Sequence, residues 1–361
     1  MSDAKPENAN SPVASTAAVP TPAPAATPPA PLTVDPTKTY IAAQWKAKSP
    51  FISCRWDPQG RYVFAGAQDN TVVRFDASGK TVELAGHDSW VRGIAGTPDG
   101  KTLLTGGNDG RLIWWPLADE APKPLRKIDA HQGWVRAVVM NRDGSQAVTC
   151  GNDHLVRLWS VTDGTLVREF KGHQSHVYHV ALHPDGKELV SIDIKGNLKH
   201  WDLTDGREVR SFAAADLFKF DPVFHADIGG ARGMEFSADG KTLACAGITN
   251  VTNAFAGIGI PAVVLIDWEK GTKKQLHRAK ADYQASSWGL NFHPAGFVVA
   301  VDGGGGGGHL LFFKSEAANE FFTFKLPGTG RDMHLSPDGL RVAVAHFDNH
   351  VRVYELRAKP A

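Results

Sequence analysis

Cysteine, net charge and long apolar runs are all scarce in this chain of 361 residues. Its three cysteines, Cys54, Cys150 and Cys245, are odd in number and far apart, which argues against a disulfide framework and favours reduced, buried thiols in a cytoplasmic protein. The net charge of +1 supplies no general attraction for nucleic acid. No apolar run reaches the ~18 residues of a membrane-spanning helix. We therefore expect neither a nucleic acid nor a membrane as the partner.

Motifs of common enzyme classes are also missing from the sequence. It contains no H-E-x-x-H and no G-x-S-x-G segment. The glycine run 303–308 is followed by His309 and Leu310, whereas a phosphate-binding P-loop has Lys and then Ser or Thr there. We expect a protein that is not an enzyme and has no cofactor and no metal site, with a flexible turn at the glycine run.

Large apolar residues are almost absent from positions 1–38, which consist largely of Ala, Pro, Ser and Thr. Such a composition cannot bury a core, so we expect a disordered tail. The tail has no apolar segment of the kind found in signal peptides and no Arg of the kind found in mitochondrial presequences.

The rest of the chain consists of short strand-like runs, and the stretch 131–173 shows their arrangement. It contains the four runs WVRAVVM, QAVTC, LVRLWS and TLVREF, separated by the turn segments NRDG, GNDH and TDG. Short runs rich in Val, Leu and aromatics, bounded by Gly, Asn and Asp, predict strands in successive hairpins. One such unit cannot bury its own faces, so it should recur along the chain.

Two independent series show that the unit recurs seven times. The first is a turn of the Pro-Asp-Gly type, which ends at Gly60, Gly100, Gly144, Gly186, Gly240, Gly296 and Gly339. The second is an aromatic residue in the third strand of each unit, at Phe75, Trp115, Trp159, Trp201, Trp268, Phe313 and Tyr354. A repeat of about 40–45 residues with four strands is typical of a propeller blade.

The chain resembles the WD-repeat (WD40) β-propellers, and within them it resembles bacterial-type WD40 repeat domain-containing proteins. The dipeptides Gly86-His87, Gly172-His173 and Trp201-Asp202 match the family, as does the blade pattern T-x3-D-x5-W at Thr105, Asp109 and Trp115. The same pattern recurs at Thr149, Asp153 and Trp159. The resemblance covers roughly residues 39–358 and implies an all-β fold, a seven-bladed propeller of four-stranded antiparallel blades. It says little of function, because one fold hosts many functions.

The blades are expected in chain order, with two insertions at the fifth. Blade one should begin at Phe51 and blade seven should end at Tyr354, which leaves too little chain for a fourth strand there. We therefore expect Tyr40–Trp45 to pair as the outer strand of blade seven and close the ring. The insertions are 213–226, before blade five, and 249–261, between its second and third strands; the glycine run occupies the equivalent turn of blade six.

The two faces of such a ring are expected to differ. If the four strands of a blade are called a to d in chain order, the loop before strand a and the turn between strands b and c lie on one face. The Pro-Asp-Gly turns, between strands a and b, lie on the other face. Both insertions and the glycine run fall on the first face, where we expect all the irregularity and hence the binding side. The insertions are also apolar, and they either bind a partner or pack on each other as a cap over blade five. Their large apolar residues are Leu217, Phe218, Phe220, Phe224, Phe255, Ile258 and Ile260.

The strand-a register predicts which side chains reach the central channel. The first residues of strand a, at the channel mouth, are Pro50, Trp90, Trp134, His176, Gly230, Ser286 and Thr329. Two residues later, on the same side of the strand, come Ile52, Arg92, Arg136, Tyr178, Arg232, Trp288 and Arg331. Arginine favours bidentate contacts with carboxylate or phosphate, and Trp, Tyr and Arg dominate binding hot spots. The alternative is that these arginines pair locally and only solvate the channel.

A second recurring set is expected to be structural. The resemblance implies a hydrogen-bonded network of His, Thr or Ser, Asp and Trp within each blade, and catalysis would need one site rather than a repeated one. Its members are His87, Thr105, Asp109, Trp115, His131, Thr149, Asp153, Trp159, His173, Ser191 and Trp201. In blade four, Lys195 stands where Asp109 and Asp153 stand in blades two and three, so this blade is expected to lack the turn Asp.

These observations predict a monomeric, non-catalytic scaffold that binds an acidic or phosphorylated protein segment at the channel mouth. The expected contact residues are Trp90, Arg92, Trp134, Arg136, His176, Tyr178, Arg232, Trp288 and Arg331. The alternative is a propeller enzyme, resembling metal-dependent hydrolases or lactonases, with its site beneath the blade-five insertions. Such an enzyme would need carboxylate and His ligands, and His176 is the one imidazole among the register positions above.

Overall fold

The structure is a computed structural model that describes residues 34–253, 258–281 and 283–359. Nearly all of the predicted tail, together with Phe255 of the second insertion, lies outside these residues. Positions 34–38 were assigned to the tail, but they are ordered here. The backbone N–H of Asp35 donates to the carbonyl of Leu356 (2.8 Å), and Pro36–Lys38 forms a short 3-10 helix, η1. No helix among the described residues is long and apolar enough to cross a membrane.

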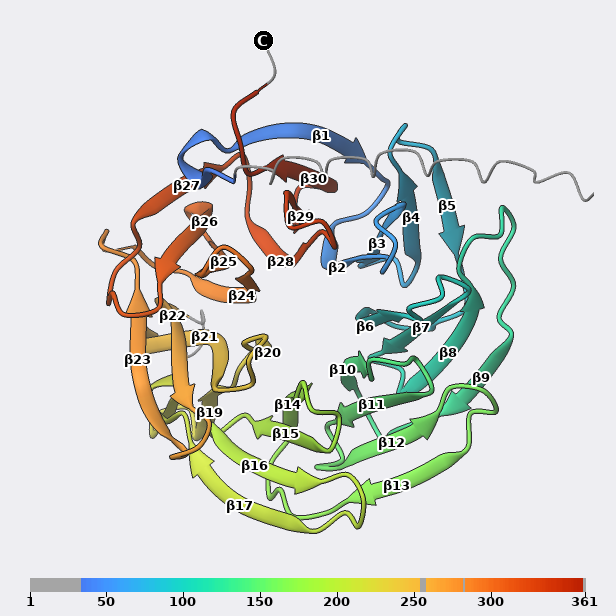
Figure 1. The fold of residues 1–361 in the computed structure, drawn as a ribbon, viewed down its shortest axis with the longest axis horizontal. Helices are drawn as coiled ribbons and strands as arrows, with labels where there is room; N and C mark the ends of the chain where they lie inside the picture. Colours follow the sequence, from blue (N-terminus) through green and yellow to red (C-terminus); the bar gives the residue numbers. More distant parts are fainter. Residues whose placement is uncertain (1–33, 254–257, 282, 360–361) are drawn as a thin grey trace, which may run out of the picture. The chain divides into compact units, whose positions relative to one another are not determined.

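Seven of the eight sheets in the described chain are four-stranded and antiparallel, which confirms the predicted seven-bladed propeller (Figure 1). Each of the first six sheets is a meander of four consecutive strands. Blade one is β2 (Phe51–Trp56), β3 (Tyr62–Ala67), β4 (Val72–Asp76) and β5 (Thr81–Leu84); blade two is β6 (Val91–Gly96), β7 (Thr102–Gly107), β8 (Arg111–Pro116) and β9 (Arg126–Asp129). Blade three is β10 (Val135–Met140), β11 (Gln146–Gly151), β12 (Val156–Ser160) and β13 (Leu166–Phe170); blade four is β14 (Val177–Leu182), β15 (Glu188–Asp193), β16 (Asn197–Asp202) and β17 (Glu208–Ala213).

The remaining blades follow the same order after an interposed hairpin. Blade five is β20 (Gly233–Phe236), β21 (Thr242–Asn253), β22 (Ile258–Asp267) and β23 (Thr272–Arg278); blade six is β24 (Ser286–His293), β25 (Phe297–Gly304), β26 (Gly307–Lys314) and β27 (Phe322–Leu326). Blade seven is β28 (Gly330–Leu335), β29 (Arg341–His346) and β30 (His350–Glu355), completed by β1 (Tyr40–Lys46).

The N-terminal strand closes the ring, as predicted. β1 pairs antiparallel with β30, from Tyr40 opposite Glu355 to Lys46 opposite His350. At the seam, the ring of Trp45 stacks on Phe75 of blade one, with centroids 5.4 Å apart. The outer strand of blade seven therefore comes from the opposite end of the chain, and this pairing covers the sheet edge that β30 would otherwise expose.

Seven apolar clusters among the described residues hold the blades together, and each lies between one pair of neighbouring blades. The predicted strand-c aromatics divide among them, one to each cluster, because each packs against the preceding blade. They are Phe75, Trp115, Trp159, Trp201, Trp268, Phe313 and Tyr354. All three cysteines are buried and unpaired, and desolvation raises their pKa values. Each blade thus depends on two neighbours for its core.

The first insertion folds as a small hairpin on blade five. After the 3-10 helix η2 (Ala215–Leu217), β18 (Phe218–Asp221) pairs with β19 (Ala226–Gly229), so strand a of this blade begins at Gly233 rather than near residue 227. Leu217 is fully buried in the cluster between blades four and five. Lys219 donates to the carbonyl of Val251 in the second insertion (2.6 Å). The two insertions therefore contact each other above blade five, as the cap alternative expected.

The glycine run 303–308 is largely part of a regular hairpin rather than a flexible turn. Gly303 pairs with Gly308 and Gly304 with Gly307 in the β25–β26 ladder. A side chain at Gly303 would place its Cβ 2.1 Å from the carbonyl oxygen of Gly330, and one at Gly308 would meet the carbonyl oxygen of Asp302 at 2.5 Å. Glycine is required at these two positions because the hairpin lies directly against the neighbouring backbone.

The expectation that all irregularity lies on one face is wrong. The connection between β8 and β9 in blade two runs from Leu117 to Leu125 and is the longest of the c–d connections. It reaches back to blade one, where Arg74 donates to the carbonyls of Leu117 (3.0 Å) and Asp119 (2.8 Å) and pairs with Glu120 (3.2 Å).

Candidate functional site

A β-bulge positions the predicted channel residues. In six blades the pairing of strands a and b skips one residue of strand a. In each case the skipped residue is the one that the strand register predicted to reach the channel. The skipped residues are Ile52, Arg92, Arg136, Tyr178, Trp288 and Arg331. In blade five, Arg232 directly precedes β20, and its N–H donates to the carbonyl of Ala246 (2.8 Å). A bulge removes its residue from the ladder and redirects the side chain.

One pocket is lined by strand-a residues from all seven blades, and four arginines converge there. We call Arg92, Arg136, Arg232 and Arg331 the arginine ring. The pocket also contains residues of blades one and four, represented by Ile52 and His179. Because every blade contributes to it, this pocket is the central channel of the propeller.

Aromatic rings hold three of the four guanidinium groups. Arg136 lies between Trp134 and Tyr178, 4.4 and 4.2 Å from the ring centroids. Trp288 lies close to both Arg232 (4.3 Å) and Arg331 (4.7 Å), and Arg331 also packs on Phe347 (4.8 Å). Stacking of this kind fixes the position of a guanidinium group without neutralising its charge.

No carboxylate pairs with the arginine ring among the described residues. Arg136 donates to the amide oxygen of Asn152 (2.7 Å) and Arg232 to the hydroxyl of Ser286 (3.3 Å). The Nε atoms of Arg92 and Arg331 are buried without a hydrogen-bond acceptor. Asp332 is near, but Arg55 holds it in an ion pair of 2.8 Å. The four convergent cations therefore have no carboxylate of the described chain in direct contact, and the nearest one, Asp332, is already paired with Arg55.

The environment lowers the pKa of every arginine in the ring, although all four stay protonated at neutral pH. Burial, together with the positive charges of Arg232 and Arg136, lowers the pKa of Arg92 to about 10. Burial is also the main cause of the lowered pKa values of Arg136, Arg232 and Arg331. The downward direction means that the folded state bears a cost for holding these charges, which a bound anion would offset.

The residues predicted at the channel mouth surround the arginine ring. Trp90 and Trp134 expose 37% and 39% of their surface, so their indole rings are accessible to a partner. The ring of His176 lies 5.5 Å from that of His154, and His176 has a lowered pKa, caused first by burial and then by Arg136. The backbone carbonyls of several of these positions accept a hydrogen bond from the start of the b–c turn. These carbonyls belong to Pro50, Trp90, Trp134, His176 and Thr329.

A side pocket of about 660 Å³ opens beside the ring between blades five, six and seven. Arg232 and Arg331 line it together with Trp288, and the glycine hairpin at 303–306 forms one wall. Gly305 and Gly306 have open space where a side chain would stand. The sequence did not predict this pocket, because it depends on how closely the hairpin approaches blade seven.

Deeper in the channel lies a second group of charges that the sequence did not predict. A pocket of about 160 Å³ is lined by Arg55, His179, Glu235, Asp332 and His334. Burial raises the pKa of Glu235 to about 7, although its carboxylate accepts hydrogen bonds from Asn291 (3.0 Å) and Phe292 (2.9 Å). Burial lowers the pKa of His179 to about 4 and that of His334 to about 3.

The repeated polar network lies away from the channel, within blades two, three and four. In blade three, His131 contacts Thr149 (2.7 Å) and Asp153 (2.8 Å), and the indole N–H of Trp159 donates to Thr149 (2.8 Å). The equivalent atoms in blade two, from His87, Thr105, Asp109 and Trp115, lie 2.8–3.1 Å apart. Each set ties the loop before strand a to strands b and c.

Blade four lacks the turn aspartate, as expected, but it has the network as well, because an aspartate at the end of strand b takes that place. His173 contacts Ser191 (2.7 Å) and Asp193 (3.3 Å), and Trp201 donates to Ser191 (2.8 Å). Asp193 is the last residue of β15, two positions before Lys195. A carboxylate at the end of strand b can reach the histidine of its blade just as a carboxylate in the b–c turn does. A comparison at fixed sequence spacing therefore missed Asp193.

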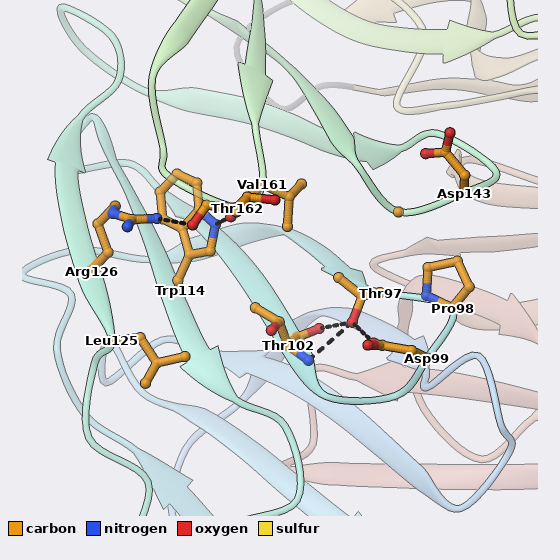
Figure 2. Close-up of a pocket in the computed structure, with 11 residues that line it drawn as sticks. Thr97, Pro98, Asp99, Thr102, Trp114, Leu125, Arg126, Asp143, Val161 and Thr162 are labelled. Atoms are coloured by element: carbon orange, nitrogen blue, oxygen red, sulfur yellow. Dashed lines mark hydrogen bonds between the residues drawn. The ribbon is translucent and has the colours of Figure 1, made fainter.

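A pocket also exists on the opposite face, between blades two and three (Figure 2). It has a volume of about 350 Å³. The Trp114 indole N–H donates to the carbonyl of Val161 (2.9 Å), and Arg126 donates to that of Thr162 (3.3 Å). Leu125, at the end of the long c–d connection, is 63% exposed at its rim. In this pocket Trp114 and Arg126 thus donate to backbone carbonyls, whereas the Nε atoms of Arg92 and Arg331 in the arginine ring have no acceptor.

Comparison with known proteins identifies the repeat type. The sequence model of the family described as "WD domain, G-beta repeat" matches four segments, residues 36–76, 79–116, 122–160 and 164–202. These segments run from the closing strand β1 to the third strand of blade four, and they include the His–Thr/Ser–Asp–Trp networks of blades two, three and four.

Curated relatives match over short regions. Nuclear distribution protein nudF 2 of Talaromyces marneffei is 31% identical over 90 residues, which is 25% of this chain and 18% of the relative. Nuclear distribution protein PAC1-1 of Uncinocarpus reesii is 40% identical over 60 residues, 16% of this chain and 14% of the relative. Nuclear distribution protein nudF of Emericella nidulans is 38% identical over 60 residues, with the same two shares. The chain thus matches less than a fifth of the length of these relatives.

Proposed function

Because this chain belongs to the WD40-repeat β-propellers, we propose that it is a non-catalytic scaffold whose arginine ring binds an acidic or phosphorylated segment of a partner protein. Propellers of this kind generally bind proteins. The place and the chemistry of binding are inferred from the channel of this particular chain.

One observation carries the proposal: four guanidinium groups converge without a carboxylate partner. Several other buried or partly buried arginines of the described chain have such partners, as Arg74 has Glu120, Arg157 has Glu169 and Arg352 has Asp348. Arg168 and Arg210 lack a carboxylate as well, but each donates to two backbone carbonyls. A guanidinium group that is buried without a hydrogen-bond acceptor is costly. A carboxylate or phosphate entering the channel mouth would supply the missing acceptors, and bidentate contacts would make the interaction strong.

The surroundings of the ring favour a protein segment over a small anion. Trp90 and Trp134 offer exposed aromatic surface at the mouth, and the side pocket beside Trp288 has room for a side chain. On the same face, the β18–β19 hairpin exposes Phe220 (49%) and Val223 (79%). Cationic anchors with aromatic neighbours and a nearby apolar patch are typical of protein-binding surfaces. We further propose that the protein acts as a monomeric propeller in the cytoplasm.

Fluorescence anisotropy with labelled peptides tests the chemistry of the ligand. The probes are a random-sequence library rich in Glu, the same library with phosphoserine, and a matched library of Gln and Ser. We expect the acidic or phosphorylated library to bind the wild type and the neutral library not to bind. Equal binding of all three libraries, or no binding of any, would contradict the proposal.

Charge-reversal variants test the location. Arg92→Glu with Arg136→Glu should abolish binding of the acidic library. The matched control is Arg142→Glu with Arg207→Glu, which changes the net charge equally in turns of the opposite face. Loss of binding in both double variants would show that only net charge matters, and would refute a specific site.

A further inference from the structure

A cluster of metal-binding side chains lies on the Pro-Asp-Gly face, outside the arginine ring. His183 and Asp185 belong to the turn between β14 and β15, and Glu188 is the first residue of β15. One potential ligand atom from each of the three lies within 4.8 Å of the other two. His183 is partly buried, whereas Asp185 and Glu188 are more open to solvent. The cluster is therefore packed against the protein on one side and accessible to solvent on the other.

The hydrogen bond of His183 Nε2 leaves the Nδ1 lone pair beside the carboxylate of Asp185. Its Nε2 lies 3.2 Å from the carbonyl oxygen of Gly240, to which only an N–H can donate. In the neutral ring the other nitrogen, Nδ1, then has no proton. This Nδ1 lies 3.0 Å from Oδ1 of Asp185. Two electron-rich atoms at this distance repel each other unless a proton or a metal ion lies between them.

The equivalent turn of blade six shows what the same histidine does without carboxylates. His293 also directs Nε2 at the next turn, 2.6 Å from the carbonyl oxygen of Gly339, and its Nδ1 accepts the N–H of Ala295 at 2.9 Å. In blade four the corresponding distance, from the N–H of Asp185 to Nδ1 of His183, is 3.4 Å. Nδ1 is thus well satisfied in blade six and poorly satisfied in blade four.

A buried imidazole beside the cluster gives an independent indication. His200 is 4% exposed, and its Nε2 is buried without a hydrogen-bond partner. The nearby acceptor is Oε2 of Glu188, 3.2 Å away. Arg210 donates to Nδ1 of His200 (3.3 Å), so the proton of the neutral ring is on Nε2, which lies beside Glu188 without completing a hydrogen bond to it. The indole N–H of Trp268 approaches the same oxygen at 3.3 Å.

We propose that His183 Nδ1, Asp185 and Glu188 bind one divalent transition-metal ion, with Trp268 orienting the Glu188 carboxylate and the unpartnered Nε2 of His200 beside it. One imidazole with two carboxylates suits zinc-like ions, which bind N and O ligands at about 2.0–2.2 Å. Two ligands on one tetrahedral ion of that size are then about 3.3 Å apart, close to the spacing of His183 and Asp185. Groups that donate to a ligating carboxylate are typical of metal sites. The ion would lie at the junction of blades four and five.

Zinc binding to the full-length, untagged protein tests this site. Isothermal titration with Zn²⁺ and metal analysis after dialysis should show one ion per wild-type chain. Asp185→Asn and Glu188→Gln should each weaken Zn²⁺ binding about tenfold or more. Even residues that only hydrogen-bond to a metal ligand typically change metal affinity by about 10–100-fold when mutated. Asp239→Asn is the matched control, because Asp239 makes the same turn contact to the N–H two residues later but lies in blade five. It should bind as the wild type does.

Two outcomes would overturn the proposal. One is the absence of stoichiometric Zn²⁺ binding to the wild type, which would leave a proton as the only group between His183 and Asp185. The other is unchanged Zn²⁺ affinity in both carboxylate variants, which would place the ion elsewhere, such as at a cysteine thiol. Circular dichroism establishes that each variant is folded, and a melting temperature raised by Zn²⁺ only where the carboxylates are intact gives a second readout.

Discussion

Single bulge residues decide what the channel of this propeller contains. The two-residue period of a strand, counted along strand a from the channel mouth, predicted that Arg92, Arg136 and Arg331 reach the channel, and all three line it. The same periodicity failed one position later. Arg331 and Asp332 both line the pocket although they are consecutive, since a bulge places two residues opposite one. The charged groups deeper in the channel, including Glu235 and His334, were therefore not predictable from a strict alternation.

Glu235 should make stability depend on pH. Its pKa is raised from 4.5 to about 7 in the fold, so its stabilising contribution is complete below about pH 4.5 and is lost as pH rises through 7. Glu235→Gln keeps an acceptor for Asn291 and Phe292 but cannot ionise. Between pH 5 and pH 8, the free energy of unfolding of the wild type should fall relative to this variant by about 2 kcal/mol.

Urea unfolding of both proteins across this range measures the difference. The neighbouring His179 and His334 titrate below their ordinary range, because burial lowers their pKa values. They lose their contribution as pH falls and do so in both proteins, so the comparison isolates Glu235. Parallel pH profiles for wild type and variant would show that the channel carboxylate does not change its charge.

The network of blade three should be sensitive to loss of one hydroxyl. Thr149 is fully buried and contacts both His131 (2.7 Å) and Trp159 (2.8 Å). Thr149→Val keeps the shape but leaves two buried polar groups without a partner, which costs about 2–4 kcal/mol. Thermal or urea unfolding measures this cost. The control is Thr165→Val, at an exposed c–d turn, which should change stability much less; equal effects would contradict a structural role for the network.

The closing strand is the element on which the whole ring depends. Sequence reasoning found β1 by its position, because the last blade lacked a fourth strand and an isolated apolar segment preceded the first. It did not find the β18–β19 hairpin, since alternating apolar residues in an insertion do not reveal a pairing partner. It also missed the reach of the c–d connection in blade two toward Arg74, which depends on contacts between blades.

Two truncations separate the closing strand from the tail. Removal of residues 1–33 should leave the melting temperature unchanged, because the predicted tail contributes no core. Removal of residues 1–46 also removes β1, its ladder with β30 and the Trp45–Phe75 stack. The loss should be at least about 3 kcal/mol, the typical effect of removing one large core side chain. Differential scanning calorimetry compares them, and equal melting temperatures would contradict non-covalent closure.

The molecule combines a nearly neutral net charge with a strong local one. The net charge is +1, yet four unpaired arginines share one channel. Repeat spacing predicted this architecture well, because each blade must bury an aromatic residue against its neighbour. The charged residues of the channel could be predicted from the strand register. The pockets beside the channel could not, because they depend on the distance between hairpins that are far apart in sequence.

Binding at the channel should depend on salt. We expect the affinity of the acidic peptide library to fall several-fold between 0.05 and 0.3 M NaCl, because the screening length decreases. Anisotropy titrations measure this dependence. Double-stranded DNA of equal charge should bind more weakly than the acidic peptides, since the net charge of +1 supplies no general attraction for nucleic acid. Stronger binding of DNA would contradict a site specific for protein segments.

The most direct test of the central claim is affinity purification from the native cell. The baits are the wild type, Arg92→Glu with Arg136→Glu, and the opposite-face control Arg142→Glu with Arg207→Glu, each confirmed as folded. The account predicts a partner that co-purifies with the wild type and the control and is lost with the ring variant. Recovery of the same proteins by all three baits would show that the arginine ring is not the docking site.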